Sequence, residues 1–367
     1  MTDQTAADQT ADDLTALKRR LHPALADLAG MGTDGLGERL AALYAPDARW
    51  RGSHPMNAAS GVEGIAETFW RPAMRAFPDL ERRDLIFIAG RSIHDPARPA
   101  RVAAMGHLCG TWREPWLGIP PTGRAAMLRY GEVHEIDAGG RIARTSLLVD
   151  VLDAMRQAGH WPLQTSPAPE TTWAGPLTAD GVRLDATDEA EGERSIRQTL
   201  AMHAALAGFD DRASLGDPVR QRAMLEAMPQ REHWHAKMMW YGPAGVGTTR
   251  GLDGFVDQHQ APFRVSFPGR RGGATLNEEG DAEGGHYLQV GDGPYSVTGG
   301  WPSVRCMHEG GEWLGMAATG RPIQMRVMDF YLHHEGLIRE NWVPIDIIDV
   351  LRQMGFDAME WLRRRAG

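Results

Sequence analysis

The chain has 367 residues, which is more than a single hydrophobic core usually supports, so we expect two domains of ordinary size. Two cysteines, Cys109 and Cys306, are too few for a disulfide framework, and no apolar run approaches the ~20 residues that a membrane span needs. The low cysteine content favours a reducing compartment, so we expect a cytoplasmic protein without a membrane span. With a net charge of −9 and scattered basic residues, the chain is expected not to bind nucleic acids.

The first part of the chain contains helix-like segments followed by strand-like segments. Residues 14–29 and 37–45 carry apolar side chains three and four positions apart, the spacing of one helix face. Four runs that alternate or are rich in β-branched residues follow and predict strands; they are residues 82–90, 100–112, 125–136 and 141–150. This order is typical of an α+β layer in which helices cover one face of a curved sheet.

A stretch rich in Pro, Thr and Ala, residues 162–181, separates this part from the next and predicts a linker. We therefore expect one domain over residues 15–162, a linker over residues 163–184 and a second domain over residues 185–367. In the second domain, helical spacing at residues 195–209 and 219–228 again precedes strand-like runs. These runs are residues 286–290, 294–301, 324–333 and 337–346.

The two domains also share sequence. The nonapeptide WLGIPPTGR at Trp116 returns as WLGMAATGR at Trp313, 197 positions later, and Trp50 and Trp240 differ by 190 positions. The matched segments keep the same order in each half, and the offset drifts by only a few residues. We infer a tandem duplication, in which the repeated nonapeptide preserves shape and chemistry is expected where the copies differ.

Several short motifs point to a known family. They are FPDL at residues 77–80, GTW with WLGIPPTGR at residues 110–124, a Gly-Arg-Ile turn, and an Asp followed by RQAG. Together they resemble the SnoaL-like polyketide cyclase family, which has the cone-shaped α+β barrel shared with nuclear transport factor and ketosteroid isomerase. The resemblance implies two tandem cone-shaped barrels, each with N-terminal helices packed on a curved, mainly antiparallel sheet and each with an apolar pocket.

The resemblance also implies a catalyst. Family members of the cyclase type close a ring by an intramolecular aldol step without metal or cofactor, using an Asp on the last strand as acid and base. This position matches Asp150 in the first half and Asp346 in the second. The family pattern of a Glu and a Trp before this Asp is kept by Glu340 and Trp342, whereas Ser146 replaces the Trp in the first half. We therefore expect Asp346 to be the principal base.

Removing a proton next to a carbonyl requires a base within hydrogen-bond reach and neutral donors that stabilise the enolate. Both Asp residues also precede a helix-like segment, so helix capping is an alternative role. The candidate catalytic residues are Asp346, His235, His308 and Asp150. The candidate substrate-binding residues, several of which core packing would also explain, are Trp240, Tyr295, Trp301, Tyr331, Trp342, Glu340, Trp50, His54, His107 and Trp112.

A metal site is the weaker reading of the histidines. His233 and His235 lie two positions apart and could bind zinc together with His259, His286 or His308. They lack a recognised ligand spacing such as H-E-x-x-H, so we expect no metal and no cofactor.

The leading hypothesis is a cofactor-independent enzyme of the lyase or isomerase/cyclase type that abstracts a proton alpha to a carbonyl. Its substrate would be a small or medium carbonyl compound, polyketide-like or keto-sugar-like. The alternatives are a non-catalytic module that binds small molecules or serves as a dimer scaffold, and a metal-dependent hydrolase or lyase. Members of this superfamily often pair sheet to sheet, so either the fused copies satisfy that interface internally or the chain forms a homodimer.

Overall fold

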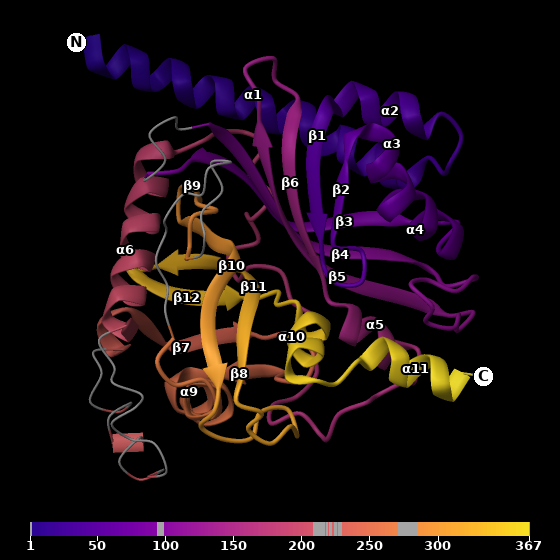
Figure 1. Ribbon diagram of the computed structural model, residues 1–367. Helices are drawn as coiled ribbons and strands as arrows, with labels where there is room; N and C mark the ends of the chain where they lie inside the picture. Colours follow the sequence, from indigo (N-terminus) through magenta and orange to yellow (C-terminus); the bar gives the residue numbers. More distant parts are fainter. Residues whose placement is uncertain are drawn as a thin grey trace.

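The computed structural model describes residues 2–93, 99–207, 230–270 and 285–366, together with residues 217, 219, 222, 223 and 226. Most of the helix predicted at residues 219–228 lies outside this part, as do residues 208 and 209 of the helix predicted at 195–209. The two halves have the same architecture, one sheet of six strands each with helices on one face (Figure 1).

In the first half, the strand order is β2-β1-β6-β5-β4-β3. Among the described strands of this sheet, β1 and β6 alone pair in parallel. The strands are β1 (Tyr44–Gly52), β2 (Ala58–Ser60), β3 (Glu81–Arg91), β4 (Ala100–Thr111), β5 (Ala125–Ile136) and β6 (Ile142–Val149). The helical segments are α1 (Thr2–Gly30), α2 (Leu36–Leu43), α3 (Gly61–Ile65), the π-helical η1 (Ala66–Trp70), α4 (Arg71–Ala76) and α5 (Val151–Gln157).

In the second half, the strand order is β8-β7-β12-β11-β10-β9, and of the strand pairs that the structure describes there, β7 with β12 is the parallel one. The strands are β7 (Trp234–Tyr241), β8 (Thr248–Arg250), β9 (Val290–Asp292), β10 (Tyr295–His308), β11 (Arg321–His334) and β12 (Leu337–Trp342). The helical segments are α6 (Glu189–Ala207), η3 (Gln230–Glu232), α8 (Gly251–Phe255), the π-helical η4 (Val256–Gln260), α9 (Ala261–Ser266), α10 (Ile347–Met354) and α11 (Ala358–Ala366).

These findings confirm an α+β fold with two tandem units and mainly antiparallel sheets. The units are not closed barrels, since the described pairings leave β2 and β3 as the edges of one sheet and β8 and β9 as the edges of the other. In Figure 1 the direction of the strands turns across the first sheet, from β1 and β6 to β3, β4 and β5. Such a change of strand direction is typical of a strongly twisted sheet.

The other face of each sheet packs against the other half of the chain. Alternation along β5 and β11 separates the two faces, because successive side chains of a strand point to opposite sides. Large apolar side chains fill this interface, as expected when two sheets stack face to face. They include Ile86, Ile88, Met105, Val133, Leu148, Val290, Val297, Met328, Phe330, Leu332 and Trp342.

The predicted linker runs along this interface. Trp173 Nε1 donates to the Gly242 carbonyl oxygen (3.2 Å), and the backbone N–H of Leu177 donates to Glu340 Oε2 (2.7 Å). A bridge between Phe87 and Val182 joins the same segment to β3. The linker is therefore anchored to both halves, while the exact domain boundaries stay a prediction.

A buried ion pair adds a further tie between the halves. Lys18 on α1 lies 2.5 Å from Asp292 on β9, and both side chains are fully buried.

Among the described helices, none combines the length and apolar character that crossing a membrane requires.

Candidate functional site

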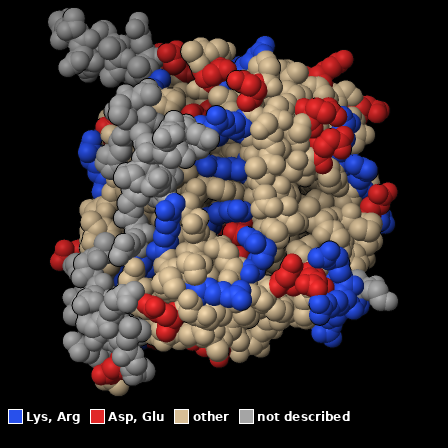
Figure 2. Space-filling model, viewed as in Figure 1, with Lys and Arg blue, Asp and Glu red and all other residues tan. Residues whose placement is uncertain are grey.

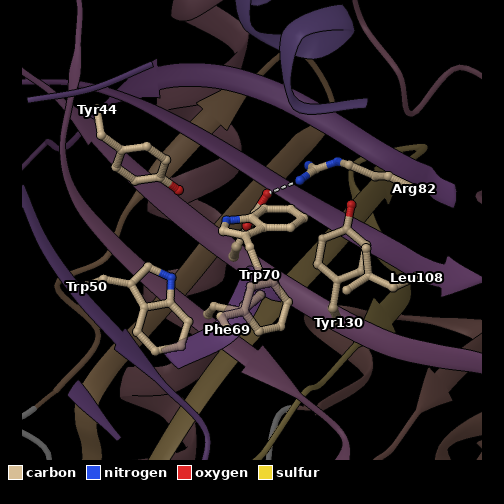
Figure 3. Close-up of a pocket in the computed structure, with 9 residues that line it drawn as sticks. Tyr44, Trp50, Phe69, Trp70, Arg82, Leu108 and Tyr130 are labelled. Carbon is tan, nitrogen blue, oxygen red and sulfur yellow. Dashed lines mark hydrogen bonds and ion pairs between the residues drawn. The ribbon is translucent and has the colours of Figure 1, made fainter. Parts of the chain in front are cut away.

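The first half contains a cavity on the helix-covered face of its sheet. It encloses about 270 Å³ of empty space, counting the part open to solvent. Between its side chains there is room for about one water molecule. The lining consists of Tyr44, Trp50, Phe69, Trp70, Arg82, Leu108, Tyr130, Glu132 and Leu147. Figure 3 shows the Trp70 indole in the middle of this lining, between Tyr44 and Tyr130.

Local structure explains how these side chains come together. Tyr130 and Glu132 are two apart on β5 and therefore point to the same side of the sheet. Phe69 and Trp70 end the π-helical segment η1, and both are buried. Such segments occur frequently at functional sites. The second half has a π-helical segment at the corresponding place, η4.

Charged groups surround Arg82 beneath the cavity. Its guanidinium lies between two carboxylates, with Nε 2.9 Å from Asp84 Oδ1 and Nη1 2.5 Å from Glu132 Oε1. The Tyr130 hydroxyl donates to Asp84, and His134 Nε2 lies 3.0 Å from Glu132 Oε1. These side chains are all buried, so their charges are weakly screened by solvent.

This arrangement fixes the charge of Glu132. Burial alone would raise the pKa of Glu132, but Arg82 and His134 outweigh burial and hold that pKa at about 2. Burial also raises the pKa of Tyr130 well above its usual value, so this hydroxyl stays neutral. Glu132 is therefore ionised at any physiological pH and is poorly suited to exchange protons with a substrate.

The second half carries a different group of polar residues on the same face. Asp329 and Tyr331 lie two apart on β11, opposite Thr298 and Ser296 of β10. The Tyr331 hydroxyl is 3.0 Å from His203 Nε2 of α6. His286 completes the group, which we call the Asp329 cluster (Asp329, Tyr331, His203 and His286).

The members of the Asp329 cluster lie close to one another. The His203 and His286 rings are 4.2 Å apart between centroids, and His286 Nδ1 lies 4.0 Å from Asp329 Oδ2 and 3.2 Å from Thr298 Oγ1. The Asp329 side chain is 12% exposed and that of His286 is 23% exposed, so solvent or a ligand can reach both.

Burial controls the protonation of the Asp329 cluster. It raises the pKa of Asp329 to about 7, and hydrogen bonds with Asn341 and Tyr331 offset only part of the rise. Burial lowers the pKa of His286 to about 4 and, together with His286, lowers that of His203 well below its usual value. It also raises the pKa of Tyr331 well above 10, so both imidazoles and the phenol are neutral at pH 7.

Glu132 and Asp329 occupy equivalent positions in the duplicated fold. Their strand partners are Ala104 and Thr298, and each lies on the helix-covered face. Glu132 has Arg82 within ion-pair distance, whereas no Lys or Arg among the described residues lies within that distance of Asp329. The pKa values of the two equivalent carboxyl groups therefore differ widely, about 2 for Glu132 and about 7 for Asp329.

The two Asp residues of the family pattern lie elsewhere, between the halves. Asp150 Oδ1 caps α5 by accepting from the Asp153 N–H (2.9 Å), and its Oδ2 accepts from the Ala244 N–H of the second half (2.8 Å). Asp346 Oδ1 caps α10, and its Oδ2 accepts from the His54 N–H of the first half (2.8 Å). The predicted capping role is confirmed, while a catalytic role stays a prediction.

Arginines accompany both carboxyl groups. Arg129 Nη2 lies 3.0 Å from Asp150, and Arg326 Nη1 lies 2.9 Å from Asp346. Burial raises the pKa of each Asp to about 6, and the arginines counter part of that rise.

Most of the other predicted residues also lie at the interface between the halves. The Tyr295 hydroxyl donates to Asp180 Oδ1 (2.6 Å), and the Trp342 indole stacks on Tyr241 with centroids 5.3 Å apart. Trp301 lies between two guanidinium groups, those of Arg51 (5.2 Å) and Arg326 (5.1 Å). The remaining interface residues of the predicted set are His54, His107 and Glu340.

Three predicted residues lie on the helix-covered faces. Trp50 lines the first cavity, Tyr331 belongs to the Asp329 cluster, and Trp240 stacks on His259 with centroids 4.0 Å apart. The structure therefore brings together few of the residues that the sequence nominated.

The last three predicted residues lie apart from the cavity lining and the Asp329 cluster. Trp112 and His308 occupy equivalent places, each packed on a phenylalanine, Phe77 at 5.2 Å and Phe267 at 5.1 Å. His235 is partly exposed on β7, with Glu335 3.9 Å away. No trio of His, Cys, Asp or Glu in the described part of the chain has the geometry of a metal site.

Sequence reasoning missed the residues that form the two polar groups. Arg82, Asp84 and Glu132 in the first half, and His203 and Asp329 in the second, were not nominated. The signal was present, since charged residues at alternate positions of otherwise apolar strands indicate a polar site on one face.

Comparisons with known proteins agree with this architecture. The family model described as SnoaL-like domain matches residues 29–145, and that described as SnoaL-like polyketide cyclase matches residues 298–354. A search of curated proteins found no match.

Solved structures give distant likenesses. A protein provisionally assigned as a SnoaL-like polyketide cyclase, from Jannaschia sp. CCS1, is 19% identical over 41% of this chain and 96% of its own (TM-score 0.32). TsrD from Streptomyces laurentii is 21% identical over 39% of this chain and 96% of its own (TM-score 0.31). A phenazine biosynthesis-related protein from Pseudomonas aeruginosa is 19% identical over 42% of this chain and 95% of its own (TM-score 0.30). One SnoaL-like family model therefore matches within each half of the chain, and together with the two equivalent sheets these matches support two SnoaL-like domains in tandem.

Proposed function

We propose that the protein is a cofactor-independent acid–base enzyme of the lyase or isomerase/cyclase type, and that its second half abstracts a proton alpha to a carbonyl group. The observation that carries this proposal is the Asp329 cluster, a buried carboxyl group without a described cationic partner beside a neutral phenol and two neutral imidazoles.

Asp329 is the proposed base. A general base works best when its pKa lies near the working pH, because it is then ionised often enough and still basic enough. The pKa of about 7 meets this condition for Asp329, whereas the pKa of about 2 fails it for Glu132. Proton abstraction leaves Asp329 protonated, and the same group can return the proton to another carbon or oxygen of the substrate.

Tyr331 and the histidines are the proposed enolate stabilisers. The Tyr331 hydroxyl, 3.0 Å from His203 Nε2, is a neutral donor in a site that excludes most water. Neutral donors aimed at a developing oxyanion are worth more in such a site than in water. His286, which keeps its ring neutral at pH 7, is a second donor beside Asp329.

The substrate class follows from the charge of this site. With no lysine or arginine within ion-pair distance of Asp329 among the described residues, the site favours an uncharged carbonyl compound over an anionic one. A polyketide-like ketone and a keto-sugar both meet this condition.

Asp346, the base expected from the family pattern, is the alternative candidate for the base in this chain.

Deuterium exchange tests the proposal without knowledge of the full reaction. The protein is incubated in D2O with a panel of ketones, β-keto esters and keto-sugars, and NMR follows deuterium entry alpha to the carbonyl. We expect Asp329→Asn to lower the exchange rate by roughly 100-fold or more. Tyr331→Phe is expected to lower it by a smaller factor.

Asp346→Asn and Asp150→Asn are the matched controls, because each removes a buried carboxyl group outside the Asp329 cluster. We expect both to keep exchange within about 3-fold of the wild type when circular dichroism shows intact folding. Loss of exchange in Asp346→Asn alone would make Asp346 the base. Absence of exchange across the whole panel in the wild type would refute the acid–base proposal.

A further inference from the structure

Two equivalent arginines lie where the halves meet, and their surroundings differ. Arg129 and Arg326 occupy matching positions on β5 and β11, and each pairs with the buried Asp that caps the last helix of its own repeat. An indole ring also lies over each guanidinium, that of Trp173 at 5.3 Å from Arg129 and that of Trp301 at 5.1 Å from Arg326. The two places can therefore be compared group by group.

The linker covers Arg129 with a peptide segment that carries a carboxylate. Glu170 Oε2 lies 3.6 Å from Arg129 Nη2, and Glu170 Oε1 accepts from the Gly245 N–H (2.7 Å). Arg129 Nη1 donates to the Thr171 carbonyl oxygen (3.4 Å). The Arg129 side chain is only 1% exposed. The protein itself thus shows which chemistry covers a guanidinium at this kind of place.

Arg326 lacks such a cover. Its side chain is 20% exposed, and its carboxylate neighbours, Asp346 at 2.9 Å and Asp349 at 3.7 Å, both belong to the start of α10. Asn57 adds a neutral amide oxygen at 3.4 Å from Nη1. In the part of the chain that the structure describes, no third carboxylate takes the place that Glu170 has beside Arg129.

A second guanidinium lies beside the same indole. Arg51 of β1 is 5.2 Å from the Trp301 ring. Its hydrogen bonds go to two neutral groups, the Ser146 hydroxyl (2.7 Å) and the Tyr287 hydroxyl (3.0 Å). No Asp or Glu of the described residues lies within ion-pair distance of Arg51, so its charge is not balanced locally.

A third guanidinium follows from the strand register. Arg305 of β10 is exposed and is the strand partner of Gln324 on β11, and Arg326 is the next residue on that face of β11. Figure 2 shows several Lys and Arg side chains along the middle of one face, although the chain carries a net charge of −9. We call the group formed by Arg51, Arg305, Arg326, Trp301 and Tyr287 the Trp301 patch.

The composition of the Trp301 patch is that of a protein-binding surface. Trp, Tyr and Arg are the residues that carry most of the binding energy at protein interfaces. A guanidinium group matches a carboxylate in both charge and planar geometry. Arg51 is already held by Ser146 and Tyr287, so binding would order few additional side chains.

We infer that the Trp301 patch binds an acidic segment of a partner protein, whose carboxylates pair with Arg51, Arg305 and Arg326 as Glu170 pairs with Arg129. A nucleic acid, the other common polyanion, is disfavoured by the net charge of −9. The inference does not rest on the proposed function, because side chains alternate along β11 and Arg326 lies on the opposite face to Asp329.

Fluorescence anisotropy with the full-length chain tests the inference. The probes are fluorescein-labelled octaglutamate, octaglutamine, which has the same length without charge, and an oligodeoxythymidylate of the same charge as octaglutamate. We expect octaglutamate to bind in a saturable way at low ionic strength and more weakly as salt is added. Octaglutamine should show no saturable binding, and the oligonucleotide should bind more weakly than octaglutamate.

Variants of the Trp301 patch locate the binding. Arg51→Gln and Arg305→Gln should each weaken octaglutamate binding by roughly 3- to 10-fold, since each removes one charge pair. Arg305 is exposed, so Arg305→Gln keeps the test valid if Arg51→Gln disturbs folding. Arg124→Gln is the matched control, because Arg124 is also exposed but lies outside the patch, and it should change the affinity by less than about 2-fold.

Four results would overturn the inference: no saturable binding of octaglutamate, equal binding of octaglutamine, tighter binding of the oligonucleotide, or an equal effect of Arg124→Gln. Asp329→Asn separates this inference from the proposed function. That variant should bind octaglutamate as the wild type does, even where deuterium exchange is lost.

Discussion

At the scale of single residues, the protein shows how one neighbour decides the chemistry of a carboxyl group. Glu132 and Asp329 hold equivalent places, and both are buried. Arg82 and His134 stabilise the charged form of Glu132, whereas Asp329 has only neutral neighbours in the described part of the chain. Burial therefore opposes ionisation at both sites, and only at Glu132 do neighbouring groups outweigh it.

This contrast predicts the effect of Glu132→Gln on stability. The pKa of Glu132 is lowered on folding from 4.5 to about 2, so ionised Glu132 stabilises the fold above pH 4.5, and this stabilisation is lost as the pH falls toward 2. Removing the charge also leaves Arg82 with one partner fewer. We expect a loss of about 2–4 kcal/mol in the free energy of unfolding at pH 7.

Urea unfolding at pH 7 and pH 3 measures this loss. The difference between the wild type and Glu132→Gln should shrink at pH 3, because Glu132 then gains little from ionising. An equal difference at both pH values would show that the side chain contributes through packing alone.

At the scale of elements, the helices that end each half also join the halves. Asp150 and Asp346 cap α5 and α10 with one carboxyl oxygen and accept a backbone N–H of the opposite half with the other. Each side chain thus satisfies two buried donors that would otherwise lack a partner. The repetition of this arrangement in both halves reflects the duplication.

Replacing Asp346 separates its charge from its hydrogen bonds. Asp346→Asn keeps one acceptor oxygen and replaces the other with an NH2 group that cannot accept, so we expect a loss of about 1–2 kcal/mol in unfolding free energy. Asp346→Ala leaves the N–H groups of Asp349 and His54 without this acceptor and should cost about 2–3 kcal/mol. Chemical denaturation of both variants checks that Asp346→Ala costs more than Asp346→Asn. Equal losses would indicate that Asp346 contributes through its charge alone.

The elements also show how far the sequence could predict this molecule. Hydrophobic spacing predicted β3, β4, β5, β6, β11 and most of α6. The repeated motifs indicated two equivalent units. β1, which carries Trp50, was missed because its sequence YAPDARWRG has a proline and several charges and lacks β-branched residues. β9 is much shorter than the predicted run and β10 is longer.

The polar sites escaped prediction for a physical reason. Which face of a strand meets the helices and which meets the other half depends on tertiary packing, and the interface between the halves has no signature in local spacing. Asp346, Tyr295 and Trp342 were nominated for a pocket, yet they lie at that interface. Asp329 was overlooked because its neighbours His203 and His286 are far from it in sequence.

At the scale of the whole molecule, the two halves form one structure through their sheet faces. The apolar interface, the linker between the sheets and the Lys18–Asp292 pair all connect them. On the face shown in Figure 2, several Lys and Arg side chains lie along the middle of the view, and acidic side chains lie mainly around them. Because the sheet faces are already paired within one chain, they are closed to a second copy, while a homodimer through another surface stays a prediction.

A larger side chain at a glycine of this interface should destabilise both halves at once. A Cβ atom at Gly131 would lie 2.7 Å from Pro344 Cγ and 2.9 Å from Phe330 Cε2 of the other half. We expect Gly131→Val to lower the free energy of unfolding by about 1–3 kcal/mol while keeping a single cooperative transition in calorimetry. Gly64→Ala, where the nearest atom is 3.8 Å away, is the control and should not destabilise the protein. Two separate transitions in the wild type would contradict the idea of one cooperative unit.

The central claim is that Asp329 changes its protonation near neutral pH. The most direct measurement is an NMR titration of the protein labelled with 13C in its aspartate carboxyl groups, with Asp329→Asn used to assign the signal. We expect the Asp329 signal to titrate with a pKa of about 7. A pKa near 4 would contradict it, because Asp329 would then be too weak a base for the proposed reaction.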